Sequence, residues 1–185
     1  MSAGPLESMT EIRWHSRGGQ GGMTASKLLA EASFKDGNEV TAFSFYGAER
    51  RGAPVSSFTR IDDEPIKLYS RVESPDVVVV LDESLVDLES VTDGLDPKGT
   101  LVMNTTDPNL VEFDGDVFVV DASQIAREYD LQADGTPIVN TPMLGGVAAA
   151  GLVDVGTVET VVEERFGRAN ARAVRAAYER TEEVN

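Results

Sequence analysis

The sequence lacks cysteine altogether and has one histidine, His15, among its 185 residues. Without cysteine the chain forms no disulfide, offers no thiolate nucleophile and supplies no cysteine ligand to an iron–sulfur cluster. A single histidine also argues against a structural zinc site. His15 stands at the end of a predicted strand, where local packing or hydrogen bonding is favoured over a role as a general base. We therefore expect no catalytic residue and no metal site in this chain.

The sequence is also short of basic residues and of long apolar runs. It has 32 acidic residues against 16 basic ones, only four of them lysines, and a formal net charge of −16. Such a charge repels nucleic acid and anionic membranes. Because no apolar run can span a bilayer or serve as the core of a signal peptide, we expect a cytoplasmic protein. The acid excess favours a salt-rich cytoplasm, where screening reduces self-repulsion, over an ordinary acidic protein.

The most informative stretch that is present runs from Ile12 to Ala32 and reads as a strand, a glycine-rich loop and a helix. Apolar residues alternate at its start and then recur with helical spacing. The glycines between them permit positive φ angles and the close approach of a ligand; they are Gly18, Gly19, Gly21 and Gly22. Such a loop directs N–H groups and a helix N-terminus toward a phosphate or carboxylate. Arg17 would add a positive charge at its entrance.

The pattern of this loop alone leaves two interpretations open. The third glycine of the dinucleotide-binding fingerprint is replaced by Thr24, and the second predicted strand, 39–45, ends without the acid that would bind a ribose. The loop also lacks the Gly-Lys-Ser/Thr order of a Walker motif, because Ser26 precedes Lys27. The loop is therefore either a ligand-binding loop or a tight turn whose glycines serve only packing.

Strand and helix patterns alternate along the rest of the chain. The run Val77–Leu81 is continuously apolar, which indicates a strand buried on both faces of a parallel sheet. Strands at 55–61 and 66–69 are too close for an intervening helix and predict an antiparallel pair. The remaining elements expected are strands at 99–104 and 116–121 and helices at 84–88, 122–129 and 157–184, the last interrupted at Gly167.

Two details of local structure are also predicted. Ser123 is a possible N-cap of the helix 122–129, and Thr141 precedes Pro142 as expected for an N-cap followed by proline. The small apolar segment beyond Pro142 predicts a helix lying very close to the sheet or to a partner protein. Together the patterns predict a disordered tail at 1–8 and a single α/β domain at 9–185. Its sheet is expected to be mostly parallel, flanked by helices on both faces, with a short antiparallel hairpin.

Three segments together carry a resemblance to a known family. They are Arg17–Gly21, Tyr46–Val55 and Asn140–Gly145, and they occur in the family's order and spacing. The chain resembles the gamma subunits of the pyruvate (2-oxoacid):ferredoxin oxidoreductases, over essentially Met9 to Tyr178. One departure is Ser16, where the family more often has glycine before the arginine.

This resemblance implies a role in a multi-subunit enzyme. The assembly converts a 2-oxoacid, favoured here as pyruvate, with coenzyme A and oxidised ferredoxin into acyl-CoA, carbon dioxide and reduced ferredoxin. Thiamine diphosphate, magnesium and [4Fe–4S] clusters are then expected on partner subunits of alpha, beta and delta type, with ferredoxin as a further partner. This chain would hold no cofactor firmly, with coenzyme A possible. The isolated chain is expected to be inactive.

The resemblance also implies a set of binding residues at the carboxyl end of the sheet. The glycine loop and Arg17 would hold an anionic group, either of coenzyme A or of a neighbouring subunit's carboxylate. The full set is Arg17, Gly18, Gly19, Gln20, Gly21, Glu49, Arg50, Arg51, Asn140 and Thr141. Two alternatives stay open: a free-standing nucleotide-binding domain, such as a dehydrogenase fragment or a ligand sensor, and a purely structural subunit.

Overall fold

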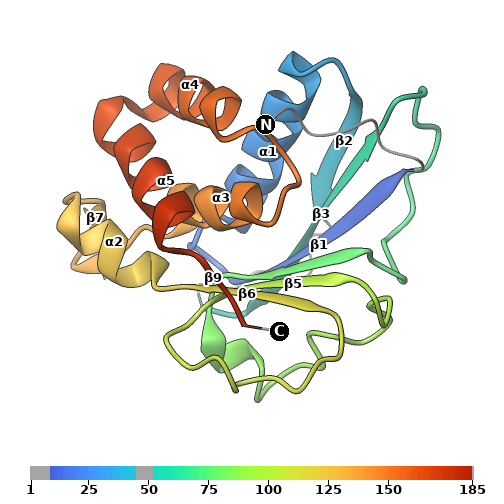
Figure 1. Ribbon diagram of the computed structural model, residues 1–185, viewed down its shortest axis with the longest axis horizontal. Coiled ribbons are helices and arrows are strands. Elements are labelled where there is room, and N and C mark those ends of the chain that lie inside the picture. Colours follow the sequence, from blue (N-terminus) through green and yellow to red (C-terminus); the bar gives the residue numbers. More distant parts are fainter. Residues whose placement is uncertain (1–8, 45–51, 185) are drawn as a thin grey trace.

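The computed structural model describes residues 9–44 and 52–184, and the tail predicted at 1–8 lies outside them. A seven-stranded sheet forms the centre, in the order β2-β3-β1-β4-β5-β6-β9 (Figure 1). β1, β4, β5 and β6 run parallel, while β2, β3 and β9 are antiparallel to their neighbours. The strands are β1 Thr10–Arg17, β2 Glu39–Ser44, β3 Pro54–Asp62, β4 Val77–Val80, β5 Thr100–Asn104, β6 Asp116–Val120 and β9 Glu182–Glu183.

The α-helices of the described residues gather on one side of this sheet, here called the helix face (Figure 1). They are α1 Gly22–Lys35, α2 Ala122–Glu128, α3 Asn140–Ala149, α4 Val155–Phe166 and α5 Arg168–Arg180. All of them share one apolar core with alternate residues of β1 and β4, including the fully buried Ile12 and Trp14. This is the expected packing of amphipathic helices on a sheet, and it forms the larger of the two apolar clusters of the described residues.

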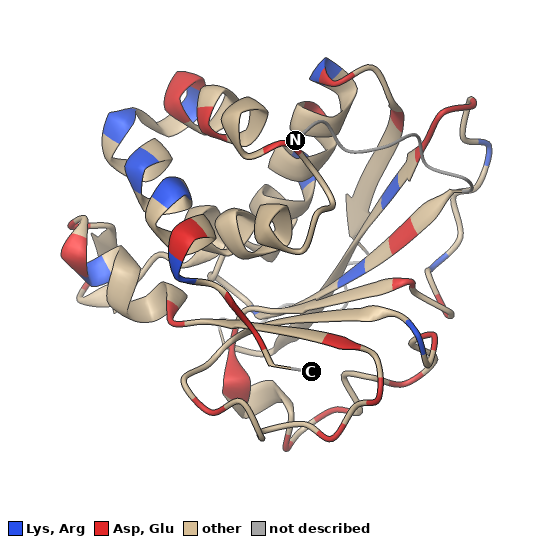
Figure 2. Ribbon diagram, viewed as in Figure 1, with Lys and Arg blue, Asp and Glu red and all other residues tan. Residues whose placement is uncertain are grey.

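The other side of the sheet, here called the loop face, is covered mainly by loops. Its one helix among the described residues is the 3-10 helix η1, Glu83–Leu85. A smaller apolar cluster lies here, with Leu85 packed near Val78 and Val80 of β4. Figure 2 shows acidic residues along these loops, whereas several basic residues lie on α5. The sequence predicts helices on both faces of the sheet. Among the described residues, the α-helices all lie on the helix face, and the loop face has only the 3-10 helix η1.

The helix α3 explains why its sequence is so small and apolar. A Cβ atom on Gly145 would lie 2.7 Å from Cβ of Ala177 and from the backbone nitrogen of Tyr178, both in α5. A Cβ atom on Gly146 would lie 3.2 Å from a side-chain carbon of Val102 and of Val120, both in the sheet. The close approach that the sequence predicts is thus made within the chain, to α5 and to the sheet.

No helix among the described residues is long and apolar enough to cross a membrane.

The predicted single α/β domain is confirmed, and β4, β5 and β6 lie within one residue of the strands predicted at 77–81, 99–104 and 116–121. The short antiparallel hairpin is β7 Gln132–Ala133 with β8 Thr136–Pro137. The hairpin partner predicted at 66–69 is wrong, because β1 and β2 already occupy both edges of β3 and leave no backbone to pair with.

Both predicted N-caps differ from those in the structure. The α2 cap is Asp121, whose carboxylate accepts a hydrogen bond from the backbone of Gln124 at 2.8 Å. α3 already begins at Asn140, so Thr141 lies inside its first turn. The Thr141 hydroxyl instead donates to the side-chain oxygen of Asn170 at 2.8 Å and links α3 to α5. Asp and Ser are about equally favoured as N-cap residues, so the presence of Ser123 alone does not fix where α2 begins.

Candidate functional site

The glycine loop lies where the sequence predicts it, between the carboxyl end of β1 and the start of α1. Gly19 and Gly21 have φ angles of 95° and 80°, in the left-handed region that glycine enters without strain. Gly21 is the N-cap of α1 and supplies no side-chain hydrogen bond to it. The first turn of α1 therefore has backbone N–H groups without a side-chain cap at this edge of the sheet.

The second predicted segment meets the loop through its backbone. The N–H of Gly18 donates to the carbonyl oxygen of Ala53 at 2.8 Å, and the N–H of Gly52 donates to that of Gly18 at 3.0 Å. Gly52 and Ala53 thus hold the start of β3 against the glycine loop. Glu49, Arg50 and Arg51 of this predicted segment lie outside the described part of the chain.

The third predicted segment meets the loop through a side chain. A Cβ atom on Gly21 would lie 2.5 Å from the amide nitrogen of Asn140, so any larger residue would displace Asn140. Asn140 in turn accepts a hydrogen bond from the backbone of Thr141 at 2.8 Å. Gly22 is confined in the same way by Ser16. A side chain at either glycine would thus collide with a neighbouring residue, so both positions require glycine for packing.

Arg17 is held by the protein rather than extended toward solvent. Its guanidinium donates to the Ser84 hydroxyl at 2.6 Å and to the carbonyl oxygen of Gly52 at 2.9 Å. Its Nε atom lies 3.4 Å from a carboxylate oxygen of Asp82. The positive charge that the sequence offers to an anion is therefore partly compensated within the chain.

Gln20 occupies the centre of the site. Its Oε1 accepts a hydrogen bond from the backbone of Arg17 at 2.7 Å, and its Nε2 donates to Asp82 at 2.6 Å. The loop also closes on itself, since the backbone of Gln20 donates to the carbonyl oxygen of Arg17 at 3.0 Å. Gln20 thereby fixes the loop against the end of β4, where Asp82 follows.

Asp82 and Ser84 are functional candidates that the sequence interpretation missed. Burial alone would raise the pKa of Asp82. Hydrogen bonds from Ser84 and Gln20, together with the charge of Arg17, outweigh burial and lower that pKa below its ordinary value. A signal was available in the sequence: Asp82 directly follows the buried apolar strand, at the sheet edge where open α/β folds bind ligands.

Two cavities open beside Gln20. One, of about 240 Å³, is lined by the first residues of the loop together with Gly52, with Thr136 and Pro137 of the hairpin and with Ile138, which follows it. The other, of about 420 Å³, extends over the ends of β4 and β5 and includes Asp82, Asn104 and Asp121. Their walls offer amides, hydroxyls and carboxylates, which suit hydrogen bonding to polar groups of a ligand. In the described part of the chain, no three acidic or histidine residues are grouped to hold a metal ion.

Comparisons with known proteins agree with this architecture. Residues 11–180 match the family model described as pyruvate ferredoxin/flavodoxin oxidoreductase. The chain is 47% identical over 185 residues to the pyruvate/ketoisovalerate oxidoreductases common subunit gamma of Pyrococcus furiosus, covering 94% of this chain and 98% of that protein. It is also 47% identical over 184 residues to the pyruvate synthase subunit PorC of Methanothermobacter thermautotrophicus, covering 95% of this chain and 98% of that protein.

A solved structure extends the likeness to three dimensions. The pyruvate oxidoreductase subunit PORC of Thermotoga maritima superposes with a TM-score of 0.83 at 39% identity, covering 97% of this chain and 100% of that one. Sequence and fold therefore agree along nearly the whole length. The chain belongs to the pyruvate ferredoxin/flavodoxin oxidoreductase family, among its gamma-type subunits.

Proposed function

We propose that this chain is the gamma-type subunit of a cytoplasmic 2-oxoacid:ferredoxin oxidoreductase whose favoured substrate is pyruvate. The complex would join coenzyme A to the acyl group left after loss of carbon dioxide and pass the electrons to ferredoxin. Since this chain has no cysteine, it cannot ligate iron–sulfur clusters. We assign these clusters, thiamine diphosphate and magnesium to partner subunits of alpha, beta and delta type.

Within that complex, we assign this chain to the coenzyme A side of the reaction. The Pyrococcus relative is named as a subunit common to pyruvate and ketoisovalerate oxidoreductases. A subunit that is common to two oxidoreductases with different 2-oxoacid substrates is suited to the reaction steps that do not depend on the substrate side chain. The observation that carries the proposal is the convergence of the glycine loop, Gly52 and Asn140 beside cavities at the carboxyl end of the sheet.

The order of the strands speaks against a free-standing dinucleotide-binding domain. In such a domain the second strand pairs with the first in parallel, which places its terminal acid near the ribose. Here β3 lies between β1 and β2, and β2 is the antiparallel edge strand. The ribose-binding position is therefore removed from the glycine loop, in keeping with the missing acid.

The substitution Gln20→Met in the assembled complex tests the coenzyme A role. Methionine has a similar size but neither donor nor acceptor, so the loop loses its hydrogen bonds to Asp82 and to the Arg17 backbone. We expect the Michaelis constant for coenzyme A to rise about tenfold, as for the loss of one to two hydrogen bonds. The constant for the 2-oxoacid should change less than about twofold.

Gln124→Met is the matched control, because Gln124 lies on the surface of α2 and its side chain donates only a long hydrogen bond to Glu128. It should leave both constants unchanged. Equal increases of the two constants for Gln20→Met, or loss of assembly, would instead support the purely structural subunit. Isothermal calorimetry with a nicotinamide cofactor or FAD completes the test, since tight binding by the chain alone would restore the nucleotide-binding alternative.

We extend the proposal to Arg50 and Arg51 on the sequence alone. Arginine binds phosphate or carboxylate through two parallel hydrogen bonds, which lysine cannot reproduce. Replacing either arginine by lysine in the complex should then raise the Michaelis constant for coenzyme A by about tenfold or more. Unchanged constants in both variants would assign the pair to surface charge.

A further inference from the structure

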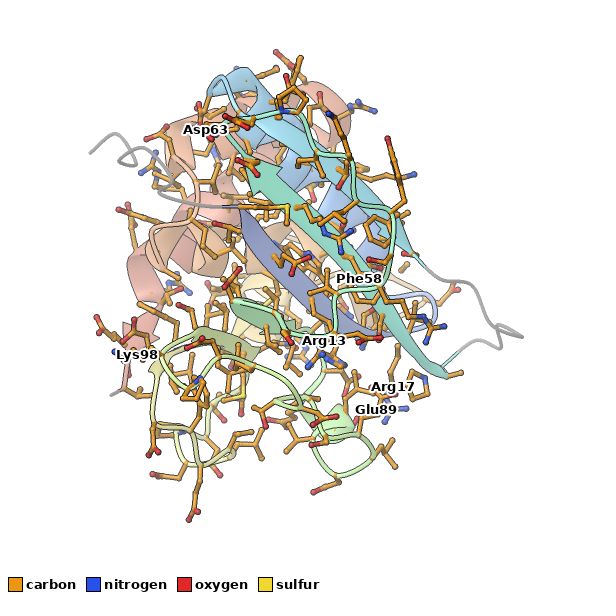
Figure 3. The ribbon with its side chains drawn as sticks, turned by 90° about the vertical axis from the view of Figure 1, so that its right-hand side faces the viewer. Arg13, Arg17, Phe58, Asp63, Glu89 and Lys98 are labelled. Atoms are coloured by element: carbon orange, nitrogen blue, oxygen red, sulfur yellow. The ribbon has the colours of Figure 1, made fainter. Side chains whose placement is uncertain are left out.

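A chain of hydrogen bonds on the loop face joins β1 to the segment that follows β4. The Nε atom of Arg13 donates to Nε2 of His15 at 3.0 Å. The Nδ1 atom of His15 lies 3.1 Å from a carboxylate oxygen of Glu89. The Nη2 atom of Arg13 also donates to the carbonyl oxygens of Val91, at 3.1 Å, and of Asp93. Figure 3 looks onto this face, with Arg13 and Glu89 in the same region as Arg17.

These contacts determine the protonation state of His15. Arginine only donates hydrogen bonds, so Nε2 of His15 must accept with its lone pair. The proton of the neutral ring then lies on Nδ1 and is donated to Glu89. The His15 residue is 5% exposed, so water offers it little alternative hydrogen bonding. The arrangement therefore requires an uncharged His15 with its proton on Nδ1.

The same segment connects this cluster with the candidate site. Its first residues, Asp82 and Ser84, contact Gln20 and Arg17 of the glycine loop. Its later residues, from Glu89 to Asp93, are the ones held by Arg13 and His15. Between them the fully buried Leu85 anchors the segment on the sheet. One strand, β1, thus fixes the segment at two places.

We propose that neutral His15 is a positioning residue that latches the segment 82–93 to β1 and thereby keeps Asp82 and Ser84 in place beside Arg17. Protonation of Nε2 would turn its N–H toward the Arg13 guanidinium, two donors facing each other with like charge. Arg13 would then leave His15 and release the carbonyl groups of Val91 and Asp93. The latch is closed at neutral pH and opens on acidification.

The charged groups around His15 influence the pH at which the latch opens. Arg13 and Glu89 contact it directly, and Arg71, Glu73 and Asp93 line the same cavity of about 730 Å³. The other strand packed along this cavity, β3, contributes the untitratable residues Ser56 and Phe58. Burial is the main cause that lowers the pKa of His15, and the charge of Arg13 adds to it, while the bond to Glu89 acts in the opposite direction. The latch therefore gives way below the ordinary histidine pKa of 6.5.

Hydrogen–deuterium exchange of the assembled complex between pH 7.5 and 5 tests the latch, after correction for intrinsic exchange rates. In the wild type we expect protection of residues 83–93 and 17–22 to fall about tenfold over this range, because the closed latch loses stability as the pH falls below 6.5. In His15→Gln the protection should not vary with pH, because glutamine can accept from Arg13 and donate to Glu89 but does not titrate. Keeping the pH at 5 or above avoids most of the carboxylate titrations.

Ser90→Ala is the control, because Ser90 is exposed on the same segment and should leave the wild-type pH profile intact. The full chain labelled on its single histidine gives the second measurement, since the nuclear magnetic resonance titration of His15 should have the same midpoint as the loss of protection. Wild-type protection that is constant with pH, or a midpoint that differs from that of His15, would overturn the latch.

The link to ligand binding rests on the proposed function and is measured separately. If the site binds coenzyme A, its Michaelis constant in the wild-type complex should rise about tenfold as the pH falls from 7.5 to 5, and His15→Gln should remove this rise. A latch that opens in the exchange experiment without any change in this constant would count against the coenzyme A site, while the latch itself would stand.

Discussion

The two faces of the central sheet are stabilised by different means. On the helix face, Ile12 and Trp14 of β1 join a continuous apolar core with all the described α-helices. On the loop face, Arg13 and His15 of the same strand hold a loop by hydrogen bonds. This division follows from the alternation of side chains along a strand. The helix face therefore holds the larger apolar core, while the loop face positions polar groups around the candidate site.

The largest expected effect comes from replacing one buried leucine by alanine on each face and comparing the losses of unfolding free energy. Leu144 in α3 and Leu85 in η1 are both fully buried. Leu144→Ala should cost about 4 kcal/mol, because rigid helices cannot close the cavity, whereas Leu85→Ala should cost about 2 kcal/mol, because the loop can relax into it. Urea unfolding of the two variants and the wild type gives both values.

Equal losses in the two leucine variants would show that the loop face is packed as rigidly as the helix face. The larger loss for Leu85→Ala would reverse the comparison. The slope of the unfolding free energy against urea concentration should be the same in each variant as in the wild type. A different slope would indicate a change in the compactness of the unfolded or folded state.

A pair of glycines tests how closely the helix face is packed. A Cβ atom on Gly145 would press on the backbone of α5, while one on Gly146 would meet side chains of the sheet at 3.2 Å. Gly145→Ala should therefore cost about 2–3 kcal/mol, since backbone atoms cannot give way. Gly146→Ala should be close to neutral, because alanine favours the helix by about 0.8–1 kcal/mol and the side chains can shift slightly. Thermal unfolding of both variants provides the measurement, and equal midpoints would show that α3 and α5 can separate at little cost.

Much of the fold follows from periodicity in the sequence. The buried run at 77–81, the strand and helix around the glycine loop, and the break at Gly167 each lie where the pattern predicts, because local burial dictates the residue types. The failures concern pairing and boundaries. The segment 66–69 has a strand-like composition, but its conformation depends on whether β3 has a free edge, which sequence periodicity does not show.

The candidate site was predicted only in outline. The segments that carry Arg17, Gly52 and Asn140 do converge, as their resemblance to the family implied. The roles of Asp82 and Glu89 were missed, since each acts on a residue more than 60 positions away in the sequence. A hydrogen bond between distant segments leaves no periodic trace, so only the structure shows that Arg17 is already paired.

The smallest expected effect concerns Asp82, where the loop face meets the glycine loop. Its folded-state pKa is lowered from 3.8, so the charged form is favoured by folding. The stabilisation is fully present above the unfolded-state pKa near 3.8 and is lost as the pH falls through the lower folded-state value. Asp82→Asn should therefore reduce the free energy of unfolding by about 1 kcal/mol at pH 7, since asparagine can keep some of the hydrogen bonds. Urea unfolding at several pH values should show this gap narrowing below pH 3.8, where the wild-type carboxylate gains its proton. A gap that is independent of pH would mean that Asp82 acts through its shape alone, and that the loop face holds Arg17 by the Ser84 and Gly52 contacts without help from charge.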